Sequence, residues 1–122
     1  MVTDRLSDID VSILVNTEEA EHMGVFTELT NQQVHDMLAT NCYAATLLTK
    51  ELIPHFKKRW ESKKVRSLVC NSSSMVSYGS CSLAQTYGAS KKYTDFLNEG
   101  LNYELSGYGV DVCSWRPAGV QT

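Results

Sequence analysis

The chain has no long apolar run, no basic arm and no closely spaced pair of cysteines. A membrane span needs about 20 consecutive apolar residues, so we expect no membrane span in this chain. Met1 is not followed by the pattern of a signal sequence. The four cysteines lack the CxxC and CxxH spacings of metal sites. We therefore expect no metal, no disulfide framework and an intracellular location.

The charge pattern argues against a nucleic-acid partner. The formal net charge is −3, and the main cluster of cations lies between residues 57 and 66, at the predicted end of a helix. Cations at that position complement the helix dipole, although a binding patch is the alternative. The length of 122 residues suits one modest domain with one hydrophobic core, and no repeat or linker divides it.

Three short apolar runs, at residues 10–16, 67–70 and 110–115, predict buried strands. Helical patterns separate these runs, and such alternation is typical of an α/β fold with a parallel sheet. Right-handed crossovers place both helices on the same face of the sheet. Because residues 13–15 are all apolar, the first strand requires cover on both faces. The chain supplies helices for one face only.

Two apolar stripes predict the helices. The first helix begins at Asn31 with Thr30 as its cap, and Pro54 is a candidate kink near its end. The second runs from about Leu83 to Ser106 and ends at glycines. The stripes consist of Val34, Leu38, Cys42, Ala45, Leu48, Leu52 and Phe56 in the first helix, and Ala89, Phe96, Leu97, Leu101 and Leu105 in the second.

Tyr87 and Lys91 are four residues apart on the second predicted helix, so their side chains share a face. A tyrosine normally titrates near pH 10, and a neighbouring ammonium lowers its pKa by favouring the phenolate. A tyrosine tuned in this way exchanges a proton with an alcohol or a developing alkoxide. The alternative is a surface lysine one turn along from a packed tyrosine.

Two further polar residues strengthen the case for a site. Ser74 lies thirteen residues before Tyr87, at the predicted end of the second strand, where parallel sheets form ligand sites. Its hydroxyl would stabilise charge on a substrate oxygen; a turn is the alternative role, and Ser72 and Ser73 compete for either. Asn41 interrupts the first apolar stripe, where a buried amide needs partners in a site or in the core.

In order and spacing, these residues resemble the short-chain dehydrogenases/reductases. The resemblance rests on Ile13–Asn16 (ILVN), on Asn41, on Ser74 with residues 87–91 (YGASK), and on residues 117–122 (PAGVQT). Residues 41–56 are most similar to the branch of 17β-hydroxysteroid dehydrogenases and very-long-chain 3-oxoacyl-CoA reductases.

The resemblance implies a fold and an activity. The fold is α/β, a partial Rossmann-like parallel sheet of about three strands with two long helices on one face. Residues 1–122 would form a single incomplete NAD(P)-binding domain that lacks its N-terminal half. The activity is hydride transfer between NAD or NADP and a carbonyl or alcohol of a steroid or long-chain acyl substrate. The implied location is cytoplasmic or associated with the endoplasmic reticulum.

The resemblance also implies the roles of individual residues. Tyr87 would be the catalytic acid/base, and Lys91 would lower its pKa and bind the nicotinamide ribose. Ser74 would orient the substrate carbonyl, and Asn41 would hold a water of the proton relay. The remaining cofactor contacts would be Asn16, Pro117, Ala118, Val120 and Thr122.

The chain departs from the family pattern in several places. The family's Asn-Asn-Ala-Gly is here NTEE at residues 16–19, which loses a glycine and adds the anions Glu18 and Glu19. Ala118 replaces a second glycine, and the sequence contains no TGxxxGxG phosphate loop. We therefore expect the isolated chain to be inactive, to bind nicotinamide nucleotides weakly and to be oligomeric or aggregated.

Two readings compete with an enzyme. One is a truncated, non-catalytic chain that forms a homo- or heterodimer with a relative through its two long helices. The other is an unrelated α/β binding module with a chance motif.

Overall fold

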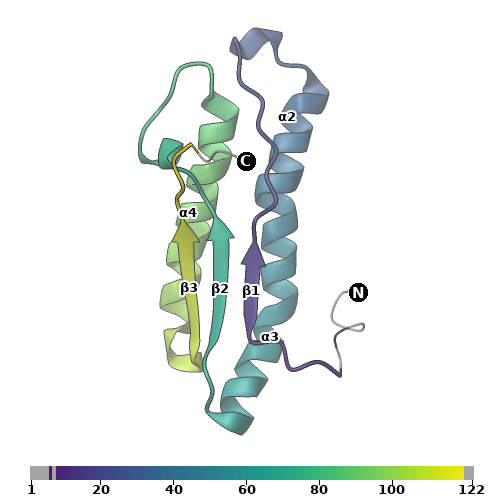
Figure 1. The fold of residues 1–122 in the computed structure, drawn as a ribbon, viewed down its shortest axis with the longest axis vertical. Helices are drawn as coiled ribbons and strands as arrows, with labels where there is room; N and C mark the ends of the chain where they lie inside the picture. The colour runs from purple at the N-terminus through teal and green to yellow at the C-terminus, as the bar shows by residue number, and fades with distance from the viewer. Residues whose placement is uncertain (1–5, 7, 120–122) are drawn as a thin grey trace.

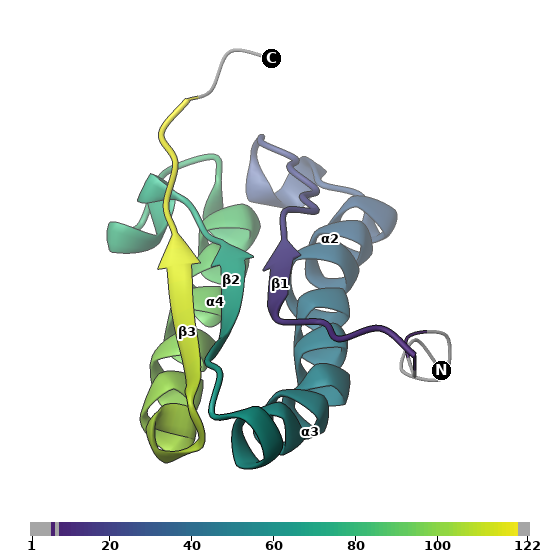
Figure 2. The ribbon, with the colours of Figure 1, turned by 60° about the horizontal axis from the view of Figure 1, so that its bottom comes forward.

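A computed structural model describes residue 6 and residues 8–119. Its centre is a parallel sheet in the order β1-β2-β3, formed by Ile13–Asn16, Ser67–Ser72 and Val110–Trp115. The long helices are α2 (Asn31–Leu38), α3 (Ala45–Lys63) and α4 (Gln85–Leu105). Figures 1 and 2 show these helices on one face of the sheet. The predicted α/β fold is confirmed.

The first long helix begins where the sequence predicted, for a local reason. The Thr30 hydroxyl accepts a hydrogen bond from the Gln33 amide at 3.2 Å, and the Gln33 side chain accepts one from the Thr30 amide at 2.9 Å. This reciprocal capping box satisfies two donors that the helix leaves unpaired. The helix then continues through Pro54, which lies inside α3.

The irregularity of this helix lies at a π-helical segment, η2 (Ala39–Ala44), which joins α2 to α3. A π-helical turn widens the helix locally, and such turns are frequent at functional sites. Asn41 lies on this segment and is 5% exposed. The sequence pattern pointed to Pro54 as the place of distortion and did not indicate this segment.

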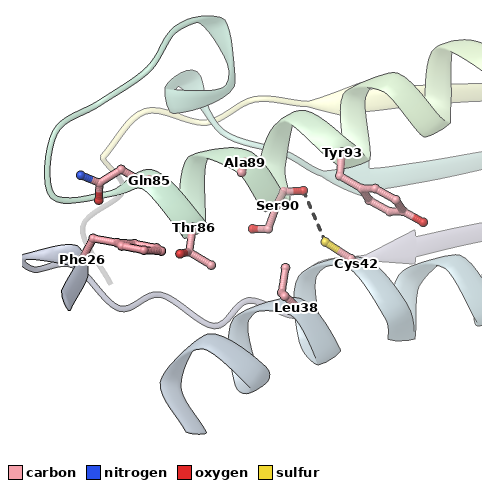
Figure 3. Close-up of a pocket in the computed structure, with 8 residues that line it drawn as sticks. All are labelled: Phe26, Leu38, Cys42, Gln85, Thr86, Ala89, Ser90 and Tyr93. Atoms are coloured by element: carbon pink, nitrogen blue, oxygen red, sulfur yellow. Dashed lines mark hydrogen bonds between the residues drawn. The ribbon is translucent and has the colours of Figure 1, made fainter. Parts of the chain in front are cut away.

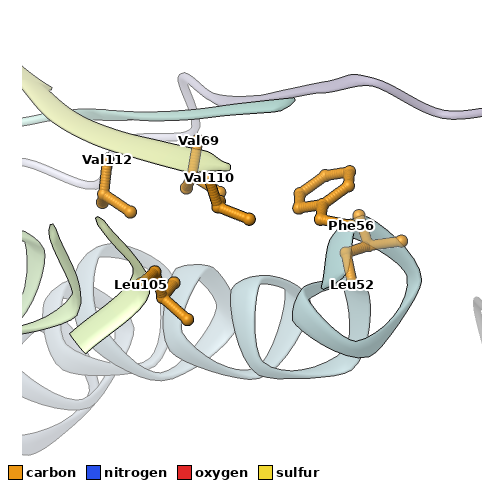
Figure 4. Packing of buried hydrophobic residues seen from close by; sticks show 6 residues of the cluster. All are labelled: Leu52, Phe56, Val69, Leu105, Val110 and Val112. Atoms are coloured by element: carbon orange, nitrogen blue, oxygen red, sulfur yellow. The ribbon is translucent and has the colours of Figure 1, made fainter. Parts of the chain in front are cut away.

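The hydrophobic core lies between the sheet and the helices (Figure 4). It consists of Leu52, Phe56, Val69, Leu105, Val110 and Val112. Not every predicted stripe position is buried, because α2 and α4 both turn part of their apolar surface outward. Phe96 is 77% exposed and Leu38 is 45% exposed.

The opposite face of the sheet has no helix over it (Figure 2). Ile13 and Val15 point to this face and are 57% and 53% exposed. The expectation of a one-sided sheet is therefore confirmed for the described residues. No helix in this part of the chain is long and apolar enough to cross a bilayer. Residues 6 and 8–119 contain no cluster of three or more His, Cys, Asp or Glu side chains suited to a metal ion.

Candidate active site

Helix α4 presents Tyr87 and Lys91 at the carboxyl end of β2. Both side chains are buried, at 5% and 1% exposure, and the Lys91 ammonium lies 5.6 Å from the centroid of the Tyr87 ring. The same ammonium donates a hydrogen bond at 3.3 Å to the carbonyl of Ser72, the last residue of β2. The helical spacing of four residues therefore places a phenol and a cation together at the sheet edge.

A third residue, Glu19, joins this pair from the segment that follows β1. The Tyr87 hydroxyl donates to Glu19 Oε1 at 2.8 Å, and Lys91 Nζ donates to Glu19 Oε2 at 3.0 Å. The sequence showed that NTEE replaces a glycine-containing motif, but it did not show that one of these carboxylates binds both site residues. The available signal was the gain of two carboxylates at the positions of a neutral motif.

The electrostatics of Tyr87 differ from the sequence-based expectation. Burial and the hydrogen bond to Glu19 raise the pKa of Tyr87 to about 12, while the Ser74 hydroxyl acts on it in the lowering direction. We expected Lys91 to lower this pKa, and in this structure that expectation is wrong. The reason is first the burial of the phenol and then its hydrogen bond to Glu19, a carboxylate with which the Lys91 ammonium also pairs.

The three consecutive serines have separate positions. Ser73 is fully buried and donates to the Lys91 carbonyl at 3.1 Å, which ties the end of β2 to α4. Ser74 caps the short helix η3 (Met75–Tyr78) and is the serine whose hydroxyl acts on Tyr87. Ser72 contributes its carbonyl to Lys91. Of the three serines, Ser74 is thus the neighbour of the phenol, and its role toward a substrate stays a prediction.

Asn41 anchors the segment that carries Glu19. Its amide oxygen accepts from the Ala20 backbone N–H, and its nitrogen donates to the Ala20 carbonyl and to the Ser90 hydroxyl, each at 2.9 Å. Ser90 lies on α4 and in turn donates to the Tyr87 carbonyl at 2.7 Å. Asn41 therefore connects η2 to the Glu19 segment and to α4. Its partner Ala20 is next to Glu19 in sequence, and its partner Ser90 is next to Lys91.

Asn16 belongs to a row of hydrogen-bonded polar side chains, of which Asn71 and Asn98 are buried. Its register partner in β2 is Asn71, whose partner in β3 is Ser114. Asn16 donates to Asn71 at 2.6 Å and more weakly to Thr49, Asn71 donates to Asn98 at 2.6 Å, and Asn98 donates to Ser114 at 2.8 Å. The row crosses all three strands and holds their carboxyl ends in register. The sequence analysis missed Asn71 and Asn98.

The remaining predicted cofactor contacts follow β3. The Pro117 carbonyl accepts a hydrogen bond from the Met75 amide at 3.2 Å, which places Pro117 beside η3. Ala118 is exposed. Val120 and Thr122 lie outside the described residues. Arg116 pairs with buried Asp95 of α4 at 2.9 Å, a contact that the sequence did not reveal.

A mostly apolar groove of about 340 Å³ flanks the site between η2 and the first turns of α4 (Figure 3). Its lining residues are Phe26, Leu38, Cys42, Gln85, Thr86, Ala89, Ser90 and Tyr93. Neither Tyr87 nor Lys91 lines it. The groove is therefore next to Tyr87 and Lys91 and does not enclose them.

Comparisons with known proteins agree with this geometry. A family model described as short chain dehydrogenase matches residues 2–122. The chain is 31% identical over 128 residues to inactive hydroxysteroid dehydrogenase-like protein 1 of Homo sapiens, covering 99% of the chain and 36% of that relative. It is 30% identical over 109 residues to a very-long-chain 3-oxoacyl-CoA reductase of Pyrenophora tritici-repentis, covering 88% of the chain and 30% of that relative.

Solved structures give the same result. A short-chain dehydrogenase from Sphingobium yanoikuyae in complex with NADPH superimposes with a TM-score of 0.88 at 29% identity, over 98% of this chain and 45% of that one. One from Streptomyces avermitilis gives 0.88 at 26% identity, over 98% and 43%. The chain thus spans less than half of these structures and about a third of the curated relatives.

Proposed function

Because the chain belongs to the short chain dehydrogenase family, we propose that it carries the proton-transfer site of an oxidoreductase acting on a carbonyl or an alcohol. The observation that carries the proposal is the meeting of three groups at the carboxyl edge of the sheet. They are the Tyr87 phenol, the buried Lys91 ammonium and the Ser74 hydroxyl. A proton donor, an adjacent cation and a second hydroxyl are suited to stabilising an alkoxide as it forms.

In this proposal, Tyr87 gives its proton to the carbonyl oxygen during reduction and takes it back during oxidation. Ser74 orients that oxygen, and the Lys91 ammonium stabilises the phenolate left after proton transfer. Asn41 would hold a water of the proton relay through an oxygen, since Ala20 and Ser90 take both of its side-chain N–H groups. The phenol donates to Glu19 in this structure, so Glu19 has to withdraw before Tyr87 donates to a substrate.

A nicotinamide cofactor, NAD or NADP, would supply or accept the hydride. The site fits one end of such a molecule. Tyr87 and Lys91 direct two donors at two neighbouring oxygens, now those of Glu19, and two vicinal ribose hydroxyls would suit the same donors. The sequence has no glycine-rich turn to bind a pyrophosphate. The residues of this chain would therefore hold the ribose end alone.

We propose a steroid or a long-chain acyl group as the substrate. Support comes from the names of the relatives, which are a hydroxysteroid dehydrogenase-like protein and a 3-oxoacyl-CoA reductase. The apolar groove beside α4 adds a physical argument, since Phe26 and Leu38 offer it a hydrophobic wall. Apolar walls with few polar groups are typical of sites for hydrophobic ligands.

The test uses a form of the protein extended at its N-terminus by a glycine-rich nucleotide-binding segment. Oxidation of NADH and NADPH is followed with ketosteroids and 3-oxoacyl-CoA thioesters. Tyr87→Phe should lower turnover by at least about 100-fold with little change in nucleotide affinity, and Lys91→Ala should harm both. Tyr43→Phe, at an exposed tyrosine on η2, is the matched control. Full turnover by Tyr87→Phe would refute the mechanism.

We also propose that the chain pairs with a second copy or a relative through α3 and α4. Phe96 and Tyr103 are 77% and 74% exposed on α4. A hollow of about 460 Å³ between the two helices has Ile53, Leu97 and Leu101 in its wall. Size-exclusion chromatography should show an oligomer that Phe96→Glu shifts toward the monomer. A monomer at all concentrations would contradict the proposal.

A further inference from the structure

Glu19 behaves as a ligand of its own protein. Each oxygen of its carboxylate accepts a hydrogen bond from one site residue, 2.8 Å from the Tyr87 hydroxyl and 3.0 Å from the Lys91 ammonium. We propose that Tyr87 and Lys91 form a carboxylate-binding site, and that Glu19 occupies it as an internal competitor of any ligand that needs both groups. The inference rests on the proposed function for the ligand it would exclude.

Burial explains why the site holds an anion. The Lys91 side chain is 1% exposed, and its other hydrogen bond goes to a neutral carbonyl, that of Ser72. A buried cation is costly unless a negative charge compensates it. The Glu19 side chain is 34% exposed, so it reaches this cation from the solvent side and can return there. The pair is thus buried at the lysine and accessible at the carboxylate.

The segment around Glu19, residues 17–24, is held close to the site. Asn41 fixes Ala20 through both its N–H and its carbonyl, and the Gly24 amide donates to the Leu83 carbonyl at 2.8 Å. Both contacts follow Glu19 in the chain, and they keep the carboxylate nearby. A tethered group acts at an effective concentration of about a millimolar or more. A free ligand therefore meets a competitor that dilution does not remove.

The geometry defines the ligands that would replace Glu19. They must offer two oxygen atoms spaced like those of a carboxylate, one for a phenol and one for an ammonium. A small free carboxylate satisfies this requirement directly. A vicinal diol, such as the ribose of a nicotinamide nucleoside, satisfies it with neutral oxygens, so it competes with Glu19 at a disadvantage in charge.

The other charges near the phenol influence the Tyr87 pKa less than Glu19 does. Glu21 acts on Tyr87 through space, as a smaller influence than the Glu19 hydrogen bond. Glu18 is exposed and is the neighbour of Glu19 in sequence. Glu18→Gln therefore removes the same charge from the same segment without touching the pair, and it is the matched control for Glu19→Gln.

The first measurement needs no cofactor. The ionisation of Tyr87 is followed by NMR on protein labelled at the tyrosine ring, with Tyr87→Phe to assign the signal. The wild type and Glu18→Gln should titrate near pH 12. Glu19→Gln should titrate at lower pH, because the anion is gone and the Lys91 ammonium is left to favour the phenolate. Equal midpoints for all three proteins would overturn the inference.

The second measurement uses acetate as the probe, with Glu19→Ala. Acetate should bind this variant with at least about ten-fold higher affinity than the wild type, since the tethered carboxylate no longer competes. If Glu19→Ala is unfolded alone, acetate should restore its folded spectrum. Absence of both binding and refolding in acetate would overturn the inference.

A third titration, with reduced nicotinamide riboside, separates the two proposals. Tighter binding to Glu19→Ala than to the wild type supports a ribose site closed by Glu19. If acetate binds Glu19→Ala but the riboside does not, the carboxylate site stands and the proposed cofactor role of Tyr87 and Lys91 is wrong.

Discussion

Replacing Asn41 by alanine should release the Glu19 segment from the helices. Asn41 is 5% exposed and makes three hydrogen bonds of 2.9 Å, two of them to Ala20 and one to Ser90. Ser90 keeps its bond to the Tyr87 carbonyl, so the main loss falls on Ala20. A hydrogen bond contributes about 1 kcal/mol net, and Asn41→Ala should therefore destabilise the fold by about 2–3 kcal/mol.

The assay has a global part and a local part. Urea unfolding followed by circular dichroism gives the change in the free energy of unfolding, with Asn31→Ala as control, since Asn31 is an exposed amide on α2. Surface changes of that kind usually stay within about 0.5 kcal/mol. Hydrogen exchange reports the Ala20 amide, which should lose protection by more than about ten-fold. The Gly24 amide, bonded to Leu83, should lose less.

Three outcomes would refute this reasoning. Unchanged exchange at Ala20 would show that Asn41 is not the anchor of the segment. A loss of stability equal to that of Asn31→Ala would show that its three hydrogen bonds have no net effect. A large loss of stability with equal deprotection of Ala20 and Gly24 would mean that Asn41 supports the whole fold rather than this segment.

Two further substitutions test the frame around the site. Gly109 has φ +65°, and a Cβ there would lie 2.4 Å from Trp60 ring carbons. Gly109→Ala should therefore lower the free energy of unfolding in urea by about 2–4 kcal/mol. Gly107→Ala is the control and should be near neutral, because a Cβ at Gly107 would have no atom within 4 Å. Burial opposes ionisation of Asp95, yet the hydrogen bond from Arg116 leaves its pKa below the usual 3.8. Its contribution to stability is present above pH 3.8 and is lost as pH falls through the lowered value, so Arg116→Gln should reduce the acid-dependent loss of unfolding free energy; an unchanged pH profile would contradict this.

Much of the fold followed from local patterns in the sequence. The strand from Val110 to Trp115 has the predicted bounds, and α2 begins at the predicted cap because Thr30 and Gln33 satisfy each other's amides. The family resemblance drawn from the YGASK motif is confirmed by the family model. These features depend on residues close in sequence, whose spacing fixes which side chains share a face.

The features that the sequence did not indicate have a different cause. Nothing local distinguishes the π-helical segment at Ala39–Ala44 from an ordinary helix, and the candidate kink, Pro54, lies further along, inside α3. Asn71 and Asn98 are hydrogen-bonded to each other only because β2 and α4 pack against each other. The high pKa of Tyr87 depends on Glu19, which is 68 residues away in the chain.

The sequence by itself determined the alternation of strands and helices, the one-sided sheet, and the pairing of Tyr87 with Lys91 on one helical face. Helical and strand periodicity act over a few residues, so they can be read from the sequence. Only the tertiary structure decided that Tyr87 is buried and that Glu19 binds both residues, which together raise the Tyr87 pKa instead of lowering it. Electrostatic coupling depends on distance in space and on burial, and residues far apart in sequence acquire both only when the chain folds.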